Sequence, residues 1–462
     1  MSRRFFAGIR VLAPAVFLVS FAGLAFPEEH SLPGLLPGTL VVSRVHYDGA
    51  PAGFTDTFPA IFNNPNISGV TGSIFLDQYL PFPLFPRLGT LALDDSKIVT
   101  SFSSKSEGAL HLSANGKFLT YMGYNAGTRL NNVSNSYTTG ANLAGNTAPQ
   151  YDREIALVSA DGSVSLTSEA NAYSGDNPRA VITADGTQFY MAGNSDSTIA
   201  KNGTGPGTTI GARFGTPGSN LSIQLGVYFA ADRPDETAKQ HVKDNNFRGI
   251  TIFDGNLYVS KGSGGNGDDG IFQVGSGLPT TTGNTITKLL GDPATDPTTG
   301  ASSPLTPFGF WFANPTTLYV ADEGNPNTDA NGNLIPDPMA GLQKWSLTSG
   351  TWKLDYVIQN GLNLYKAENV PGYPVPTFTY GIRNLTGITN WDGSVTIYAI
   401  TAQFSTMSGG EPDPTRLVAV ADPPGAKSLA TGFEALFLDR FVTLQQSRSG
   451  DVFRGVAFAP RH

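Results

Sequence analysis

Three arginines stand at the same place in a short pattern that recurs along the sequence. Arg179, Arg248 and Arg454 each precede a small residue at the start of an apolar stretch, and Arg383 stands three residues before Thr386 in a further copy of the pattern. Guanidinium groups grip carboxylates, phosphates and sulfates through paired hydrogen bonds. The four side chains therefore predict an anion site if they surround one opening. The alternative is that each arginine bonds to main-chain carbonyls of the neighbouring repeat.

A single histidine also falls inside one of these apolar stretches. His111 lies between Leu110 and Leu112, so in a strand it points to the side opposite both leucines. On a channel wall it could act as a general base, bind a ligand or bind a metal. The alternative is a hydrogen-bonded structural histidine. The chain has only 5 histidines and no second one at an equivalent position, so we do not expect a histidine-based zinc site.

Oxygen-bearing side chains alternate along one later segment, and these are the candidate metal ligands: Asn327, Asp329, Asn331, Asn333 and Asp337. Alternating oxygen ligands around a glycine, here Gly332, are typical of calcium loops. The bidentate acid that a full EF-hand needs would fall on Pro338, so the segment predicts a weaker structural calcium site. An ordinary Asx-Gly hairpin tip is the alternative. Asp322 and Glu323 form a further acidic pair at a predicted strand end.

Composition restricts the class of protein. The 462 residues carry a net charge of −8, which argues against a nucleic-acid partner. Only 14% of residues are charged, while 54 glycines and 32 prolines indicate a turn-rich β protein rather than long surface helices. The absence of cysteine excludes disulfides, thiolate nucleophiles and cysteine-ligated metals.

The N-terminus has the pattern of an export signal. Arg3, Arg4 and Arg10 precede or open an apolar run that ends at Phe26, with small residues before a predicted cleavage after Ala25. Residues 2–6 resemble the twin-arginine signal; ordinary secretion and an uncleaved anchor are the alternatives. We expect residues 1–25 to be a signal peptide. The mature chain, 26–462, is expected to be a secreted or periplasmic monomer with no membrane span.

The recurring pattern consists of an apolar strand, a tight turn and a second apolar strand. Six first strands begin near residues 108, 178, 247, 307, 385 and 453, about 70 residues apart. Most are followed by Asn-Gly or Asp-Gly, the strongest short-range hairpin signal. The third copy continues through strands at 247–252, 256–260, 270–274 and 285–290. Four antiparallel strands repeated radially predict an all-β, six-bladed β-propeller.

The two ends of the chain complete each other in this scheme. The last copy has only its first strand, at 453–458, whereas the mature N-terminus supplies strands at 38–45, 72–80 and 89–93 with no first strand before them. One C-terminal and three N-terminal strands therefore make the closing blade. An open two-domain sandwich is the structural alternative. Segments 125–150, 194–218, 292–306 and 361–380 are expected to be loops on the propeller faces, where binding surfaces are built.

One stretch resembles a known repeat family. Leu318–Asn325 (LYVADEGN), followed by Gly341–Trp345, resembles the NHL-type propeller repeat, and Leu257–Gly262 is similar to a degenerate copy. The sequence also looks like uncharacterised secreted bacterial propellers and, more distantly, like the gluconolactonase and paraoxonase group. That last resemblance implies a calcium ion in the central channel on Asn, Asp and Glu side chains. Its ligand set has no residue-by-residue match in this sequence.

These features favour an exported binding or scaffold protein over an enzyme. We expect its loop face or channel mouth to engage an extracellular small molecule, glycan or protein, with an anionic group as the recognised feature and calcium as a structural ion. A calcium-dependent hydrolase of lactones, esters or phosphoesters is the alternative. Convergence of the arginines and His111 on one ion-sized hollow would favour the hydrolase.

Overall fold

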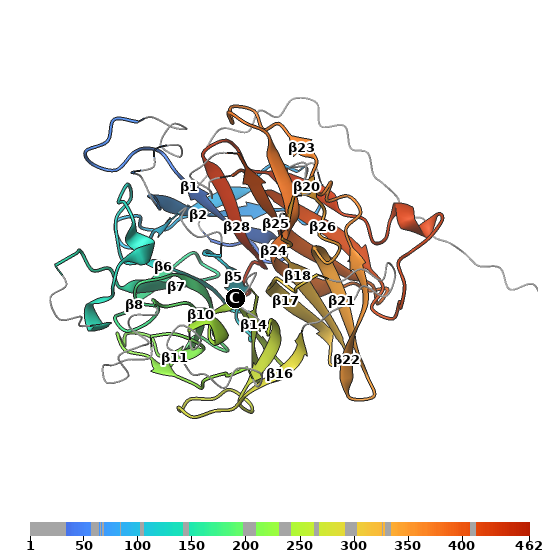
Figure 1. The fold of residues 1–462 in the computed structure, drawn as a ribbon, viewed down its shortest axis with the longest axis horizontal. Helices are drawn as coiled ribbons and strands as arrows, with labels where there is room; N and C mark the ends of the chain where they lie inside the picture. Colours follow the sequence, from blue (N-terminus) through green and yellow to red (C-terminus); the bar gives the residue numbers. More distant parts are fainter. Residues whose placement is uncertain are drawn as a thin grey trace, which may run out of the picture.

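A computed structural model describes most of the chain, namely residues 34–56, 64, 66, 69–83, 85–101, 106–141, 147–196, 209–230, 242–262, 268–291, 303–325, 327–328, 334–406 and 413–462. In this part of the chain, six antiparallel sheets of four or five strands stand around a common axis. Figure 1 shows them as blades surrounding the point where the C-terminus lies. The predicted six-bladed β-propeller is confirmed.

Five blades follow each other along the chain. The first contains β5 (Leu110–Leu112), β6 (Phe118–Tyr124), β7 (Arg153–Ser159) and β8 (Val164–Glu169). The second contains β9 (Pro178–Ile182), β10 (Phe189–Gly193), β11 (Arg213–Gly215) and β12 (Ile223–Gln224). The third contains β13 (Phe247–Phe253), β14 (Asn256–Lys261), β15 (Gly270–Val274) and β16 (Ile286–Gly291).

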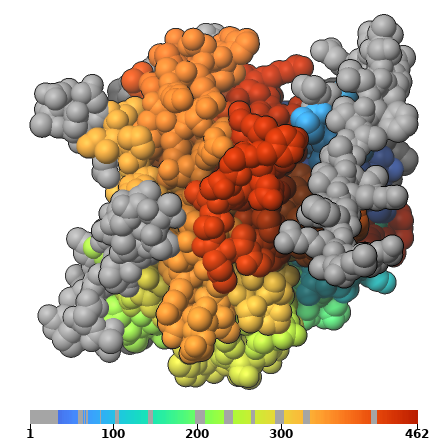
Figure 2. Space-filling view, turned by 90° about the vertical axis from the view of Figure 1, so that its right-hand side faces the viewer, coloured from blue at the N-terminus to red at the C-terminus, as the bar shows by residue number. Residues whose placement is uncertain are grey.

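The next two blades carry small additions. The fourth contains β17 (Pro307–Asn314), β18 (Thr317–Asp322), β21 (Gly341–Thr348) and β22 (Thr351–Ile358), with the separate pair β19 (Asn327–Thr328) and β20 (Leu334–Ile335) between its middle strands. The fifth contains β24 (Thr377–Thr389), β25 (Val395–Ser405), β26 (Arg416–Asp422) and β27 (Val442–Gln446), and β23 (Ala367–Glu368) pairs with β24. Figure 2 looks from the side onto this fifth blade, coloured orange to red.

The closing blade joins the two ends of the described chain. β28 (Asp451–Phe458) is its innermost strand and pairs with β1 (Leu40–His46), which continues to β2 (Thr71–Tyr79) and β3 (Gly89–Ala92). β4 (Thr100–Ser101) also pairs with β2. The Asp451 carboxylate lies 2.8 Å from His46 Nδ1 and 3.1 Å from Arg44 Nη1, so an ion-pair cluster reinforces the main-chain ladder. The predicted closure by one C-terminal and three N-terminal strands is confirmed.

Both faces of most sheets are covered by the neighbouring blades. One apolar cluster joins Ile182 and Tyr190 of the second blade to Phe247 and Phe272 of the third, and similar clusters fill the other interfaces. All five residues of β9 are buried for this reason. Hydrophobic burial between blades therefore supplies the main stabilisation of the ring. Within the described part of the chain, no helix is long and apolar enough to cross a lipid bilayer.

The two faces of the ring differ in their connections. Each first strand runs into a tight hairpin, at 113–117, 183–188, 254–255, 315–316 and 390–394. This side, which we call the turn face, also carries the connections 275–285 and 423–441. The opposite side, which we call the loop face, receives the connections from second to third strands and from one blade to the next. The described parts of the four segments predicted as long loops belong mainly to it, although they include the short strands β11 and β23.

A glycine in the recurring pattern allows adjacent innermost strands to approach closely. A Cβ atom on Gly249 would lie 2.3 Å from the carbonyl oxygen of Phe308, and one on Gly455 would lie 2.4 Å from the main-chain nitrogen of Leu110. Gly309 meets the same restriction from β24. Atoms cannot approach so closely without a shift of the backbone, so these glycines form a narrow level that we call the waist of the channel.

Candidate functional site

Four innermost strands place an arginine next to the waist, on its loop-face side. β9, β13, β24 and β28 supply Arg179, Arg248, Arg383 and Arg454, respectively. Arg179, Arg383 and Arg454 are only 5%, 5% and 2% exposed, and the Arg248 side chain is 12% exposed. The charge of Arg248 acts on both Arg179 and Arg383, which places these guanidinium groups in one neighbourhood. We call the four residues the arginine cluster.

Arg179 is tied to the next blade. Its Nη1 donates to the Phe247 carbonyl at 3.1 Å and to the Asn246 side-chain oxygen. This is the neighbouring-carbonyl bond expected under the structural interpretation. Its buried Nε, however, has no hydrogen-bond acceptor in the described part of the chain. Burial, together with the charge of Arg248, lowers the pKa of Arg179 to about 9.

Arg248 is held more loosely. Its guanidinium lies over the Phe308 ring, 4.6 Å from the ring centroid, and its Nη1 lies 3.5 Å from Glu323 Oε2. Its Nε is buried without an acceptor among the described residues. Burial lowers the pKa of Arg248, and the Glu323 carboxylate opposes that shift. Arg248 therefore retains hydrogen-bonding capacity that the described protein groups do not use.

Glu323 connects Arg248 to a second arginine. Arg383 Nη2 lies 3.6 Å from Glu323 Oε1, and Tyr380 donates its hydroxyl proton to the same oxygen at 2.9 Å. Arg383 also donates to the Tyr380 hydroxyl. The Glu323 side chain is 11% exposed, close to the value for Arg248. The arginine cluster therefore reaches solvent on the side where Arg248 and Glu323 meet.

Glu107 is the carboxylate on the other side of the arginine cluster. It accepts hydrogen bonds from the hydroxyls of Thr100 (2.6 Å) and Tyr124 (2.5 Å) and from Asn177 Nδ2 (2.8 Å). Burial raises the pKa of Glu107, while the hydroxyls of Thr100 and Tyr124, the main-chain nitrogen of Ser101 and the charge of Arg454 oppose the rise. This carboxylate is fully engaged inside the protein, so the Glu107 side is closed.

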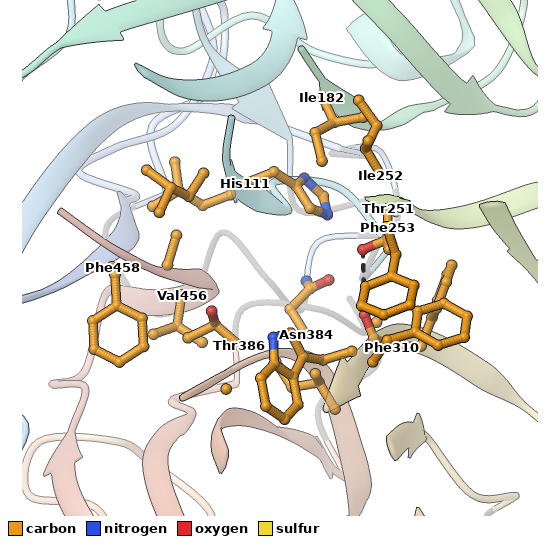
Figure 3. Close-up of a pocket in the computed structure, with 18 of the residues that line it drawn as sticks. His111, Ile182, Thr251, Ile252, Phe253, Phe310, Asn384, Thr386, Val456 and Phe458 are labelled. Atoms are coloured by element: carbon orange, nitrogen blue, oxygen red, sulfur yellow. Dashed lines mark hydrogen bonds between the residues drawn. The ribbon is translucent and has the colours of Figure 1, made fainter. Parts of the chain in front are cut away.

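His111 does not join the arginines. It lines a cavity of about 220 Å³ that the six innermost strands enclose between the waist and the turn face (Figure 3). None of the four arginines lines this cavity; its lining residues follow them along the strands, as at 251–253 after Arg248 and 456–458 after Arg454. Three residues of a strand span about 10 Å. The arrangement thus gives no support to the hydrolase alternative, which needed one shared hollow.

The candidate calcium loop can be described only in part. Asp329, Asn331 and Asn333 lie outside the described residues, and only the main chain of Asn327 is described, in β19. The Asp337 carboxylate is buried and accepts bonds from the Ser303 hydroxyl (3.0 Å) and from the main-chain nitrogens of Asn325 (3.0 Å) and Met339 (2.9 Å). In the described part of the chain, no three His, Asp or Glu residues gather as a metal site would require. Calcium binding stays a prediction.

Several residues that contact the arginine cluster could not be identified from the sequence. Glu107, Tyr124 and Tyr380 occupy positions without a motif, so nothing marked them as neighbours of arginine. Glu323 was noted only as one of an acidic pair. Phe308 carried a usable signal, because Pro-Phe-Gly stands in the fourth repeat where Phe-Arg-Gly stands in the third. An aromatic ring at the arginine position of one repeat can stack against the arginine of the preceding repeat through a cation–π contact.

Comparisons with known proteins find likeness only at the level of fold. No family model and no curated protein sequence matches the chain. The haemagglutinin-neuraminidase ectodomain of parainfluenza virus 5 is 10% identical over 74% of this chain and 75% of that one, with a TM-score of 0.37. A quinonprotein alcohol dehydrogenase-like protein of Bacteroides thetaiotaomicron is 11% identical over 94% and 97% of the two chains (TM-score 0.32), and the computationally designed Ika8 protein is 10% identical over 92% and 98% (TM-score 0.30). These values carry no argument about activity or ligand, and the NHL type of the repeat stays a prediction.

Proposed function

We propose that this propeller is a binding protein that captures an anionic group of its ligand on the loop face, through the arginine cluster. One observation carries the proposal: four blades direct arginines to one level of the channel, and Arg179 and Arg248 keep buried Nε–H groups without acceptors in the described part of the chain. A buried donor left unsatisfied costs about 1–3 kcal/mol. A carboxylate, phosphate or sulfate would satisfy such donors and neutralise the mutual repulsion of the arginines.

Arg248 is the first contact in this proposal. Its ion pair with Glu323 is long, at 3.5 Å, and it lies where the arginine cluster reaches solvent. A planar anion can bond to two N–H groups of one guanidinium, which gives orientation as well as affinity. The surrounding loop-face connections would then select the rest of the ligand, as loops do on other rigid scaffolds.

The proposed setting follows from the N-terminal sequence. An export signal in residues 1–25 would deliver the mature protein, acting as a monomer, to the periplasm or the outside of the cell. The ligand is then a small molecule, glycan or protein that carries an anionic group in that compartment. A structural calcium ion in the 327–337 segment belongs to the same proposal and would stabilise a loop of the fourth blade rather than perform chemistry.

Anion-dependent thermal unfolding tests the proposal. Melting temperature is measured with sulfate, inorganic phosphate, citrate and galacturonate, each against sodium chloride at equal ionic strength, and affinities are measured by calorimetry. We expect at least one anion to stabilise the wild-type protein, because a ligand that binds only the folded state raises its stability. Arg248→Ala should lower the affinity for that anion about tenfold or more, which corresponds to a loss of about 1.4 kcal/mol in binding free energy. The anion affinity of Arg248→Lys should lie between those of the wild-type protein and Arg248→Ala, because lysine keeps the charge but loses the paired donors.

The matched control is Arg129→Ala. Arg129 is 54% exposed and pairs with Asp48 at the surface, so its loss should leave anion binding unchanged. If no anion stabilises the wild-type protein, or if Arg248→Ala lowers the melting temperature while the response to anions stays the same, the arginine cluster is structural and the proposal is wrong.

A further inference from the structure

The cavity on the turn-face side of the waist has a wall that is more apolar than polar, and it is large enough for a small molecule. Its volume is about 220 Å³, and its wall includes Ile182, Phe253, Phe310, Val456 and Phe458. Its volume exceeds the roughly 150 Å³ of an apolar cavity that binds benzene in another protein. This cavity therefore has the size and the surface to take a single aromatic ring with a substituent.

His111 adds one polar group to this apolar wall. Figure 3 shows its imidazole directed into the cavity, with the nitrogen farther from the main chain, Nε2, towards Asn384. The other nitrogen, Nδ1, is buried and has no hydrogen-bond partner in the described part of the chain. A neutral imidazole offers one N–H donor and one acceptor nitrogen. Nε2 is therefore the ring nitrogen that a molecule in the cavity can reach, and it can form a hydrogen bond with a hydroxyl group, which both donates and accepts.

The imidazole is neutral under ordinary conditions. Burial lowers the pKa of His111 to about 4, against a slight opposing effect of the Val181 carbonyl. Asn384 adds a second polar edge: its Nδ2 donates to the Arg454 carbonyl at 2.7 Å, so its side-chain oxygen is available as an acceptor. Neither group supplies a charge to the cavity. A charged ligand would lose its hydration without compensation there.

We propose that this cavity is a second binding site, for a small neutral molecule with an aromatic or branched apolar body and one hydroxyl group that hydrogen-bonds to His111 Nε2. Phenol is the simplest probe of this class. The site differs from the arginine cluster in the end of the channel that it occupies and in the charge of its ligand. It does not depend on the anion-binding function.

Phenol and toluene form a matched pair of probes, because a hydroxyl group in one replaces a methyl group in the other. Binding to the purified protein is measured for both by ligand-observed NMR and calorimetry at pH 7. We expect phenol to bind about three- to tenfold more tightly than toluene, the range that one net hydrogen bond provides. In His111→Phe, the two probes should bind equally. His46→Phe is the control, since His46 lies in the closing blade beside Asp451 and outside the cavity.

A second variant fills the cavity and leaves His111 in place. Thr386 is half-buried and lines the cavity, so Thr386→Phe should abolish binding of both probes. This variant tests the proposal even if His111→Phe does not fold. Arg248→Ala should leave phenol binding unchanged, which separates this site from the proposed anion site. The proposal is overturned if neither probe binds the wild-type protein, if the preference for phenol survives in His111→Phe, or if Thr386→Phe binds both probes as before.

Discussion

The two halves of the central channel are built from the same six strands and yet present opposite chemistry. On the loop-face side of the waist, Arg248 and its three counterparts surround a level with the carboxylates Glu107 and Glu323. On the turn-face side, the wall is more apolar than polar, carries none of the arginines, and includes His111 as a neutral hydrogen-bonding group. A displacement of about three residues along a strand, or about 10 Å, separates these environments.

The connections explain this difference. Charges inside a protein need partners, and Glu323 and Glu107 stand at the loop-face ends of strands, directly after β18 and three residues before β5. The hairpins that follow the innermost strands on the turn face place no carboxylate in the cavity lining, which carries aromatic and aliphatic side chains instead. In this propeller, the carboxylates beside the loop-face strand ends allow that end of the channel to hold buried arginines.

The largest expected effect comes from the waist, which both halves share. In Gly455→Ala, the new Cβ would lie 2.4 Å from the Leu110 main-chain nitrogen and 2.7 Å from the Gly108 carbonyl oxygen. The closing blade must therefore move away from the first blade, at a cost of about 3 kcal/mol or more. We expect a lower midpoint of urea unfolding and weaker binding of both anion and phenol.

Gly425→Ala is the control for the waist. Gly425 is exposed, and a Cβ at this position would meet no atom within 4 Å. Its unfolding midpoint should match that of the wild-type protein within error. If Gly455→Ala is equally stable, the innermost strands can separate at the waist at no cost, and the two halves are less rigidly divided than the structure indicates.

The next largest effect concerns the arginine half of the channel and the competition between Glu323 and an external anion. Glu323→Gln removes the carboxylate that competes with an external anion for Arg248 and Arg383. We expect anion affinity to rise about tenfold, because the electrostatic attraction between opposite charges near a protein surface amounts to several kcal/mol before solvent compensation. The folded state should also lose some stability in the absence of anion. Phenol binding in the other half should not change.

Calorimetric titration of Glu323→Gln with the anion that stabilises the wild-type protein checks this result. A fall in anion affinity would contradict it and would show that Glu323 positions the arginines instead of competing for them. Glu434→Gln is a suitable control, since Glu434 lies in the 3-10 turn Glu434–Leu436 of the turn-face connection 423–441.

The fold was predictable because its signals are local. Asx-Gly turns between apolar runs identify hairpins, and the predicted third blade, 247–252 to 285–290, agrees with β13 to β16 to within a residue or so at each boundary. Closure of the ring followed from counting strands at the two ends. These inferences need only the pattern of a strand and the chemistry of its turn, both of which are written in neighbouring residues.

The sites were less predictable because their parts meet through tertiary structure. The sequence pattern placed four arginines at related positions but could not show that Glu323 would fold back between Arg248 and Arg383, since loop paths depend on the whole fold. His111 was expected on the channel wall, where it lies, but its separation from the arginines depends on the stagger between β5 and β28. Gly455 contacts Leu110 and Gly108, so His111 lies beyond the level of the arginines.

The smallest expected effect is the contribution of His111, in the neutral half of the channel, to the pH dependence of folding stability. The pKa of His111 is lowered to about 4 in the folded protein, from about 6.5 in the unfolded chain, so acidification protonates the unfolded chain first and stability falls as pH drops from 6.5 towards 4. Between pH 7.5 and 6, this single residue should change stability by less than about 1 kcal/mol.

Other groups oppose this trend. Burial raises the pKa of Glu154 and Glu169 to about 7, so their contribution to stability rises as pH falls. The informative quantity is therefore the difference between the unfolding free energies of the wild-type protein and His111→Phe, measured by urea unfolding at each pH, because the carboxyl contributions cancel. That difference should move against the wild-type protein as the pH falls. A difference that stays constant would mean that His111 titrates alike in the folded and unfolded states, and the turn-face cavity would then lack the neutral hydrogen-bonding group that distinguishes it from the arginine end.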